Sequence, residues 1–362
     1  MSYSIAVLPG DGVGPEVTAQ GVRVLETVGR VFGHTFHFTT HLVGAVALRT
    51  YDTAMQPETL EDCRRSDAIL FGAVGDPTGD DARIIREALF PLRKTFDLFA
   101  NLRSVKVYPP LIGGTTLKPE FLHGVDLIVV RELTGGLYFG KPKRQWRSLQ
   151  GRQGVDTLRY SEREIRRVLQ VGFELARQRR KKLTSVDKAN VLETSRLWRQ
   201  IALELAAEYP DVALEHMYVD NAAMQLVRRP AAFDVIVTEN MFGDILTDEA
   251  AVLAGSMGML PSASLGKRRR DGTAFGMYEP IHGTAPDIAG QDQANPLASI
   301  LSAALLLRYS LGLEREAQAI ERAVEQVLEA GYRTVDIADE GATILGTQAM
   351  GDKVAELVAA GG

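Results

Sequence analysis

The stretch FDVIVTENMFGDILTDEAA, residues 233–251, joins a short apolar run to a segment with helical spacing. Residues 233–240 have the pattern of a strand, and residues 241–256 have the apolar spacing of an amphipathic helix. A strand that passes directly into a helix is the repeating unit of an α/β sheet. The rest of the chain should therefore alternate in the same way.

Other parts of the chain repeat this alternation. Strand-like runs are expected at 4–10, 68–74, 125–133, 183–191, 214–222 and 233–240, and helices at about 15–32, 162–180, 193–207, 241–256, 296–311, 315–330 and 347–360. Strands that alternate with helices predict an α/β fold, in which helices cover the faces of a sheet.

The chain also divides near its middle. Residues from about 140 to 160 are polar and punctuated by glycine, which suggests an arm that leaves the globular body. Beyond about residue 255 the pattern becomes mostly helical. The pattern is consistent with a central domain inserted between two outer thirds that fold together.

Composition bounds the function. Hydrophobic residues make up 45% of the 362 residues and charged residues 24%, as in an ordinary globular protein. No run reaches the roughly 18 apolar residues of a membrane span, and no signal peptide is recognised. A single cysteine, Cys63, excludes an internal disulfide and suits a reducing cytoplasm. The net charge of −5 gives no overall reason to expect nucleic acid.

Two basic runs have structural interpretations that compete with binding. Residues 177–182, RQRRKK, end a predicted helix, where cations suit the helix dipole. Residues 267–272, KRRRDG, are typical of an exposed loop or hairpin. Because no aromatic residues lie between these arginines, nucleic-acid binding is disfavoured.

Two aspartates share one face of the predicted helix. Asp244 and Asp248 are four residues apart, and like charges at this spacing repel by a few tenths of a kcal/mol. A solvated surface would tolerate them, with Asp244 near the helix N-terminus. Alternatively, a divalent cation such as Mg²⁺ or Mn²⁺ would turn the repulsion into coordination, and Asp220 at the end of another strand could supply a third carboxylate.

Three arginines could recognise an acidic substrate. Arg93 and Arg103 are ten residues apart, and Arg131 opens the run RELTGGLYFG. The guanidinium fork grips carboxylates with two hydrogen bonds, so three arginines and a metal would suit a substrate with two carboxylates. Three unrelated surface ion pairs are the alternative.

Two other motifs point away from familiar sites. GDGVGP, residues 10–15, resembles a dinucleotide fingerprint, but Pro15 occupies the position of the third glycine. The motif therefore predicts a tight loop near a ligand and a helix start rather than a Rossmann turn. His37 and His41 share one face of a predicted strand, where half-exposed positions are expected rather than a metal site.

Taken together, the motifs resemble the isocitrate/isopropylmalate dehydrogenase family over residues 3–355. They are LPGDGVGPEV, LRKTFDLFANLR, RELTGGLYFG, TSVDKANVLETSRLWR, YVDNAAMQLVRRPAAFDVIVTENMFGDILTDEAAVLAGSMGMLPSASLG and EPIHGTAPDIAGQDQANPLASILSAALLL. The resemblance implies a two-domain α/β fold without a Rossmann site and with the active site in a cleft between domains. The large domain would comprise 1–98 and 255–362, and the central domain 99–254, which would carry the dimer interface and the arm.

The resemblance also assigns roles to residues. The substrate carboxylates would be bound by Arg93, Arg103 and Arg131, and the metal by Asp220, Asp244 and Asp248. Lys188, with nearby Asp187 or a water, would remove the proton of the substrate hydroxyl. Tyr138 would return a proton after decarboxylation. Lys188 and Asp220 would come from the neighbouring subunit of a homodimer, and Asp220 would also contact substrate.

The loop HGTAPDIAGQDQAN resembles the family's adenosine-binding loop. Its expected contacts with the cofactor are His282, Gly283, Thr284, Ala285, Pro286, Asp287, Ile288 and Asn295. A carboxylate at Asp287 can accept hydrogen bonds from ribose hydroxyls and would repel a 2′-phosphate. Relatives that use NADP carry Lys-Tyr at these two positions, so NAD is expected.

Substrate choice depends on Leu89 and Phe90 in EALFPLRK. Isocitrate enzymes place Ser-x-Asn here to hold a third carboxylate, which two apolar side chains would leave unpaired. An alkyl substituent, as in isopropylmalate, is expected instead, with oxidative decarboxylation in leucine biosynthesis as the reaction. Phe90 departs from the leucine common at this position, and residues 74–90 are also unusual. Rivals are a dehydrogenase of tartrate, D-malate or homoisocitrate, and a subunit without catalysis.

Overall fold

The computed structural model describes residues 1–76, 79, 81–115 and 117–361 and contains two compact units. The first comprises Met1–Leu98, Val107–Pro119 and Ala254–Gly362, and the second Phe99–Lys106 and Glu120–Leu253. The segment Val107–Pro119 lies in the first unit, whereas the expected bounds of the central domain, 99–254, include it. Its 3₁₀ turn contacts the helix Glu314–Glu329, and Arg333 Nη2 donates to the carbonyl oxygen of Pro110 at 3.1 Å.

The first unit contains five neighbouring strands. Their order is β2 (Thr35–Thr40), β1 (Ser2–Gly10), β3 (Ala68–Ala73), β12 (Ala274–Pro280) and β11 (Pro261–Arg268). Only the β12–β11 pair among these is antiparallel. The basic run at 267–270 lies at the tip of this hairpin and is exposed, as expected. These two strands lie in the part of the chain beyond residue 255, where the pattern was expected to be mostly helical.

Helices pack around the strands of the first unit. The long ones are α1 (Gly14–Phe32), α10 (Leu297–Tyr309), α11 (Glu314–Glu329) and α12 (Thr347–Gly361), and α1 contacts both α10 and α12. Helix α10 is buried on nearly every side, since its central turns contain only Ala, Leu, Ile and Ser. The short ones are α2 (Ala45–Tyr51), α3 (Pro57–Arg65), α4 (Asp81–Ile84), the π-helical turn Ile85–Leu89 and α5 (Phe90–Thr95).

The second unit contains five further neighbouring strands. Their order is β4 (Ala100–Lys106), β5 (Asp126–Glu132), β10 (Val235–Thr238), β8 (Lys182–Asp187) and β9 (Ala213–Tyr218). Strand β4 is antiparallel to β5, and the other neighbours are parallel. The long helices of the second unit are α6 (Glu162–Gln178), α7 (Glu193–Ala206), α8 (Val219–Arg228) and α9 (Asn240–Ala251).

Strands β8 and β9 end earlier than the sequence predicted. Strand β8 stops at Asp187, whose carboxylate accepts a hydrogen bond from the Ala189 amide at 2.9 Å and so starts a turn. Strand β9 stops at Tyr218, and α8 begins at the next residue. Both strands are parallel to β10, so their carboxyl ends lie at the same edge of the sheet as the start of α9.

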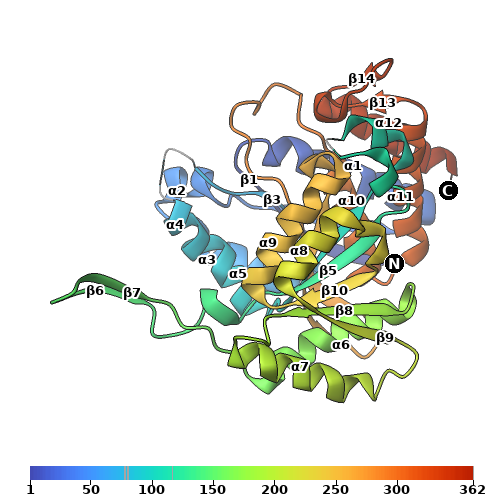
Figure 1. Cartoon of the computed structure of the whole chain (residues 1–362). Helices are drawn as coiled ribbons and strands as arrows, with labels where there is room; N and C mark the ends of the chain where they lie inside the picture. The colour runs from blue at the N-terminus through green and yellow to red at the C-terminus, as the bar shows by residue number, and fades with distance from the viewer. Residues whose placement is uncertain (77–78, 80, 116, 362) are drawn as a thin grey trace. The chain divides into compact units, whose positions relative to one another are not determined.

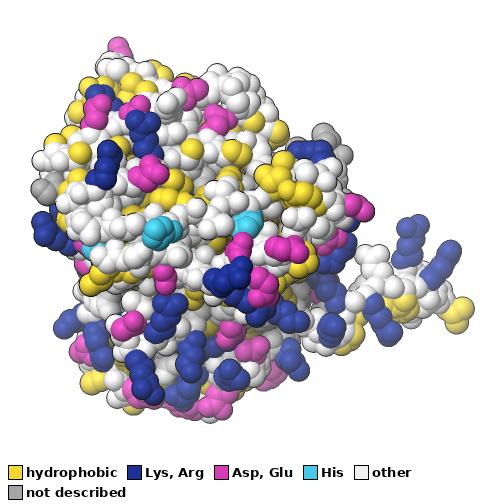
Figure 2. Space-filling model, turned by 180° about the vertical axis from the view of Figure 1, so that it is seen from behind, with side chains coloured by type: hydrophobic (Ala, Val, Ile, Leu, Met, Phe, Trp, Pro, Cys, Tyr) yellow, Lys and Arg dark blue, Asp and Glu magenta, His cyan; other side chains and the backbone are white. Residues whose placement is uncertain are grey.

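An antiparallel hairpin occupies part of the predicted arm. Strands β6 (Arg144–Ser148) and β7 (Gly151–Val155) pair only with each other, and Figure 1 shows the hairpin extending away from the rest of its own unit. Figure 2 shows Lys and Arg side chains along this projection. Over the described ranges, the longest helices lack the apolar length that crossing a bilayer requires.

The basic run at the end of α6 is engaged in ion pairs. Arg177 binds the carboxylate of Asp211 at 2.7 Å, and Arg179 binds that of Asp234 at 2.8 Å. Lys182 binds Glu215 at 3.0 Å. These pairs tie the helix end to neighbouring strands and loops, which supports the structural interpretation of the run over a binding role.

Candidate active site

A carboxylate, a guanidinium and a phenol meet at the start of α9. Arg131, at the end of β5, is only 5% exposed and forms an ion pair with Asp244 Oδ1. The other oxygen of Asp244 accepts a hydrogen bond from the Tyr138 hydroxyl at 2.8 Å. Asn240 Oδ1 accepts from Arg131 Nε at 3.1 Å and from Nη2 at 2.8 Å. Asp244 is thus held between two residues of the RELTGGLYFG run.

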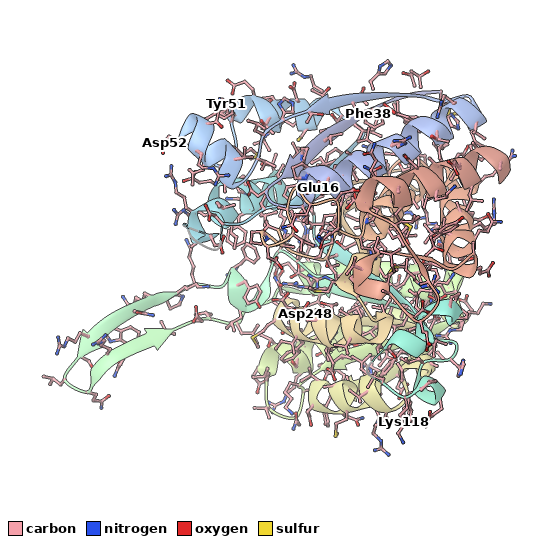
Figure 3. The ribbon with its side chains drawn as sticks, turned by 90° about the horizontal axis from the view of Figure 1, so that it is seen from above. Glu16, Phe38, Tyr51, Asp52, Lys118 and Asp248 are labelled. Carbon is pink, nitrogen blue, oxygen red and sulfur yellow. The ribbon has the colours of Figure 1, made fainter. Side chains whose placement is uncertain are left out.

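Asp248, one turn further along α9, has its own arginine. Arg103 on β4 donates from Nη1 to Asp248 Oδ1 at 3.1 Å and to Thr247 Oγ1 at 2.8 Å. Figure 3 shows Asp248 on α9, and its side chain is 76% exposed. Each of the adjacent aspartates therefore faces one guanidinium, which offsets their mutual repulsion within the chain.

Burial raises the pKa of the Tyr138 hydroxyl, and its hydrogen bond to Asp244 raises it further. The nearby guanidinium of Arg131, whose carbon lies 5.9 Å from the ring centre, acts in the opposite direction. The phenol consequently keeps its proton over a wider pH range than an exposed tyrosine does. A phenol that remains protonated beside a carboxylate is suited to donate a proton.

Lys188 and Asp220 form a second cluster in the same unit. Lys188 Nζ pairs with Asp220 Oδ1, and this hydrogen bond holds the pKa of the Asp220 carboxyl below its usual range. Asp220 therefore remains ionised, as a metal ligand must. Asp187 is buried and binds Arg199 through both oxygens, at 2.8 and 2.9 Å. That pairing occupies Asp187, which the sequence analysis had placed beside Lys188 in proton transfer.

The remaining predicted substrate residues lie in the first unit. Arg93 on α5 has Nη2 at 4.0 Å from Glu279 Oε1. Leu89 ends the π-helical turn Ile85–Leu89, and Phe90, 37% exposed, follows it directly. Single π turns are rare and recur at functional sites, because they shift the phase of the side chains that follow. Residues 77, 78 and 80 of the unusual 74–90 segment lie outside the described residues.

The three predicted metal ligands are all carboxylates, the donor type that a hard divalent cation binds. Asp220, Asp244 and Asp248 offer only oxygen donors, which Mg²⁺ and Mn²⁺ prefer. Within the described part of one chain, however, three or more acidic, His or Cys side chains do not gather into a metal-binding group. The chain by itself brings Asp244 and Asp248 onto one face of α9 but pairs Asp220 with Lys188.

The predicted adenosine loop packs against the glycine loop of residues 10–14. The Val13 amide donates to the Thr284 carbonyl at 2.9 Å, and a Cβ at Gly12 would lie 1.9 Å from that oxygen. Glu16 on α1, labelled in Figure 3, accepts a hydrogen bond from the Gly290 amide. The two motifs therefore form one structure in the first unit.

Side chains of this loop show which atoms a cofactor could meet. His282 Nδ1 hydrogen-bonds the Gly283 carbonyl at 2.9 Å, while its Nε2 is buried without a hydrogen-bond partner. Burial lowers the pKa of His282, so the ring is neutral near pH 7. A buried unpaired nitrogen is costly unless a ligand meets it. Asp287 is exposed and available to a ribose.

Asn295 differs from the rest of the predicted cofactor contacts. Its side-chain oxygen accepts from the Leu297 amide at 3.0 Å, at the start of α10, and its nitrogen donates to Asp336 at 3.1 Å. Asn295 is buried, and both side-chain groups are therefore used within the chain. Its backbone remains the part that a cofactor could contact.

Sequence reasoning missed several residues that support these clusters. Asp11 is buried and accepts hydrogen bonds from the amides of Ala45, Val46 and Gly75 at 2.7, 2.7 and 3.1 Å. These hydrogen bonds tie the loop of residues 10–14 to the start of α2 and to the segment after β3. An aspartate between two glycines was the available signal. Tyr160 and Asn240 carried no such signal, since one lies in the polar arm segment and the other in an ordinary helix start.

Comparison with known sequences identifies a family over nearly the whole chain. The model described as isocitrate/isopropylmalate dehydrogenase matches residues 4–354. A 3-isopropylmalate dehydrogenase of Dehalococcoides mccartyi is 55% identical over 363 residues, covering 99% of this chain and all of the relative. One of Gloeobacter violaceus is 57% identical and covers 97% of each chain.

Comparison with solved structures gives the same family of folds. An isocitrate dehydrogenase from Methylococcus capsulatus superposes with a TM-score of 0.86 at 34% identity, over 99% of both chains. A β-decarboxylating dehydrogenase from Thermococcus kodakarensis superposes with a TM-score of 0.79 at 34% identity, over 98% of this chain and 96% of the other.

Proposed function

The chain belongs to the isocitrate/isopropylmalate dehydrogenase family, and on that premise we propose that it oxidatively decarboxylates 3-isopropylmalate to 4-methyl-2-oxopentanoate and CO₂. The reaction is a step of leucine biosynthesis and would use NAD and Mg²⁺ or Mn²⁺. The observation that carries the proposal is the contact of Asp244 with both Arg131 and Tyr138. It brings together the three chemical groups that a carboxylate substrate, a metal and a proton return require.

Different residues would bind the carboxylates and the alkyl group of the substrate. Arg103 and Arg131 present guanidinium groups beside the metal-binding face of α9, where the substrate's carboxylates would bind. Arg93 would add a third cation. Leu89 and Phe90 would receive the alkyl group, since burial favours each methylene by about 0.8 kcal/mol, whereas a third carboxylate would be left without a partner.

Two residues would move protons. Lys188 would take the proton of the C2 hydroxyl while hydride leaves C2, and Asp220 beside it would hold the ammonium in place. Tyr138 would donate its proton to C3 after CO₂ has left, and the raised pKa of its phenol keeps the hydroxyl protonated until then. The nicotinamide, when bound, accepts the hydride.

The metal would be held by Asp244 and Asp248 of one subunit and Asp220 of its partner. When bound, it polarises the C2 oxygen and stabilises the negative charge that decarboxylation creates. Arg131 and Arg103 would then share the two aspartates with the metal, and they keep these carboxylates oriented on α9. Asp220 stays ionised because of its hydrogen bond from Lys188.

The cofactor is proposed to be NAD, bound by the loop of residues 282–295. The exposed carboxylate of Asp287 would accept hydrogen bonds from the ribose and repel the 2′-phosphate of NADP. The buried Nε2 of His282 supports a polar ligand at this loop. The remaining contacts would come from the backbone between Gly283 and Ile288.

The enzyme is proposed to work as a homodimer with shared active sites. Helices α8 and α9 pack together and expose apolar side chains, among them Met224, Val227 and Ile245, the last at 59%. Apolar surface gathered on two adjacent helices is typical of a subunit interface. A dimer through this surface would also allow Lys188 and Asp220 of one subunit to reach the α9 carboxylates of the other. The cytoplasm is the proposed location, which suits the single buried cysteine.

The function is tested by initial rates with Mg²⁺ or Mn²⁺ on isopropylmalate, isocitrate, D-malate, tartrate and homoisocitrate, each with NAD and with NADP. We expect the highest kcat/KM for isopropylmalate with NAD, and no turnover after chelation. A higher kcat/KM for another acid would assign the enzyme to that rival substrate. A preference for NADP would refute the role given to Asp287.

Changing Phe90 to leucine is expected to alter which alkyl-substituted malates the enzyme prefers. Phe90 adjoins the π-helical turn and is partly exposed, so the smaller leucine leaves more room beside it. The change per methylene should be about tenfold, at the low end of the discrimination that an apolar pocket achieves for one methylene. The kcat/KM ratios of ethyl-, isopropyl- and isobutylmalate measure this. Unchanged ratios would exclude Phe90 from the pocket, and Phe121→Leu, another exposed phenylalanine, is the control.

A further inference from the structure

Two buried carboxylates lie behind the Arg131–Tyr138 cluster, and the proposed mechanism uses neither. Glu132 ends β5 and is 0% exposed, and Glu239 precedes α9 and is 5% exposed. Burial is the largest influence on both and raises the pKa of each. Two acids in such a place are expensive to bury unless their oxygens are well bonded.

The hydroxyl of Tyr160 lies between the two acids. Its oxygen is 3.2 Å from Glu132 Oε2 and 3.4 Å from Glu239 Oε2, and it accepts a hydrogen bond from the Asn240 amide at 3.0 Å. A phenol has one proton, so it can donate to only one of the acids at a time. The hydroxyl thus joins the end of β5 to the start of α9.

Glu132 closes the backbone loop that leads to Tyr138. Its Oε1 accepts from the Thr134 amide at 3.0 Å, and its Oε2 accepts from the Gly135 amide at 2.7 Å. The Tyr160 ring packs so tightly on this loop that a Cβ at Gly135 would lie 2.7 Å from the ring. At Gly136, whose φ is +75°, a Cβ would lie 2.4 Å from the hydroxyl. The loop can therefore follow this path only with glycine at both positions.

Asn240 connects the same loop to the substrate-binding arginine. Its oxygen accepts from Nε and Nη2 of Arg131, and its nitrogen donates to the Gly135 carbonyl at 3.1 Å. Gly243, one turn along α9, leaves room for Arg131, because a Cβ there would lie 2.6 Å from Arg131 Cγ. Asn240 therefore fixes the guanidinium, and Gly243 leaves space for the aliphatic part of the same side chain.

We propose that Tyr160 and Asn240 are positioning residues, which set Arg131 and the 132–138 loop against α9 so that Arg131 and Tyr138 meet Asp244 in one arrangement. Neither residue needs to touch substrate. The proposal deepens the proposed function, on which its kinetic part rests, since it assigns hydroxy-acid binding and proton return to one buried network. The proposed nucleotide-binding loop, residues 282–295, is outside this network. Changing the network should therefore impair hydroxy-acid binding and turnover and leave NAD binding unchanged.

The test uses Tyr160→Phe, which removes the hydroxyl and keeps the ring that packs on the loop and on Trp198. We expect KM for the hydroxy acid to rise and kcat to fall, with kcat/KM lower by about tenfold to a hundredfold, as small displacements of binding groups produce. The dissociation constant for NAD alone should stay within about twofold, because that loop keeps its contacts. Asn240→Ser should give the same selective pattern and serves if Tyr160→Phe does not fold.

The control is Tyr278→Phe, which removes another buried hydroxyl, bonded to Ser310 Oγ at 2.7 Å in the other unit. It should lower the melting temperature and leave KM for the hydroxy acid unchanged. Hydroxy-acid KM and kcat at wild-type values in both Tyr160→Phe and Asn240→Ser would overturn the proposal. So would an equal loss of NAD and hydroxy-acid binding, which indicates general damage.

A second readout is independent of activity. Hydrogen exchange in the Tyr160→Phe protein should accelerate at the amide of Asn240, which loses its acceptor, and at the amides of Thr134 and Gly135, because their acceptor Glu132 loses the hydrogen bond from the Tyr160 hydroxyl. If the wild-type enzyme oxidises none of the hydroxy acids, the proposed function fails, whereas the exchange result still decides the positioning role. Unchanged exchange at these three amides would contradict it.

Discussion

Replacing Lys188 with methionine is expected to lower kcat by about 10²- to 10⁴-fold, the range that a general acid or base contributes. Methionine keeps an unbranched side chain and removes the amino group that pairs with Asp220. Substrate and NAD should still bind, since the arginines and the 282–295 loop are unchanged. Steady-state kinetics at saturating metal measure the effect.

The matched control for this variant is Lys182→Met. Lys182 starts β8, the strand that ends next to Lys188, and pairs with Glu215 at 3.0 Å. Both variants remove one lysine cation from one ion pair, Lys182 at the start of β8 and Lys188 just beyond its end, and only the Lys188 variant should lose catalysis. A Lys188→Met enzyme with at least a tenth of the wild-type kcat would remove Lys188 from the mechanism.

Changing Asp244 to asparagine is expected to lower kcat/KM by about 10³-fold, since a metal contributes several kcal/mol to a transition state that develops negative charge. The same change removes the carboxylate from Arg131 and from Tyr138. The concentration of Mg²⁺ or Mn²⁺ needed for half-maximal rate should rise. Metal titration of the rate, compared with Asp211→Asn as the control for an exposed ion-paired aspartate, measures it.

The Asp244→Asn variant should also change the pH dependence of its residual activity. After burial, the hydrogen bond to the Asp244 carboxylate is the next cause that raises the pKa of Tyr138. Without that negative charge the phenol should lose its proton at a lower pH. The alkaline limb of the pH–rate profile should therefore move to lower pH. An alkaline limb that moves to higher pH or keeps its position would contradict the assignment of Tyr138 as the proton donor.

The sequence predicted those parts of the site that lie on regular elements. Strand 235–238 and the helix after it form a local unit, so the spacing of Asp244 and Asp248 on one face followed from helical periodicity. Asp220 was expected at the end of a strand, and it lies two residues beyond the last residue of β9, Tyr218.

Other features could not be predicted because tertiary contacts decide them. The segment Val107–Pro119 carries no composition signal, and its place in the first unit depends on Arg333, far away in the chain. Asp187 is adjacent to Lys188 in sequence, yet Arg199 on α7 binds its carboxylate. The role of Tyr160 depends on a packing of its ring on two glycines that no local pattern encodes.

The central claim is that each active site takes Asp244 and Asp248 from one subunit and Lys188 and Asp220 from the other. Mixing Lys188→Met with Asp244→Asn after dissociation and reassociation tests it most directly. If sites are shared, each mixed dimer has one intact site; with half of the dimers mixed, about one quarter of the wild-type activity should return. If the mixture stays as inactive as its two components although mixed dimers have formed, the shared site is contradicted.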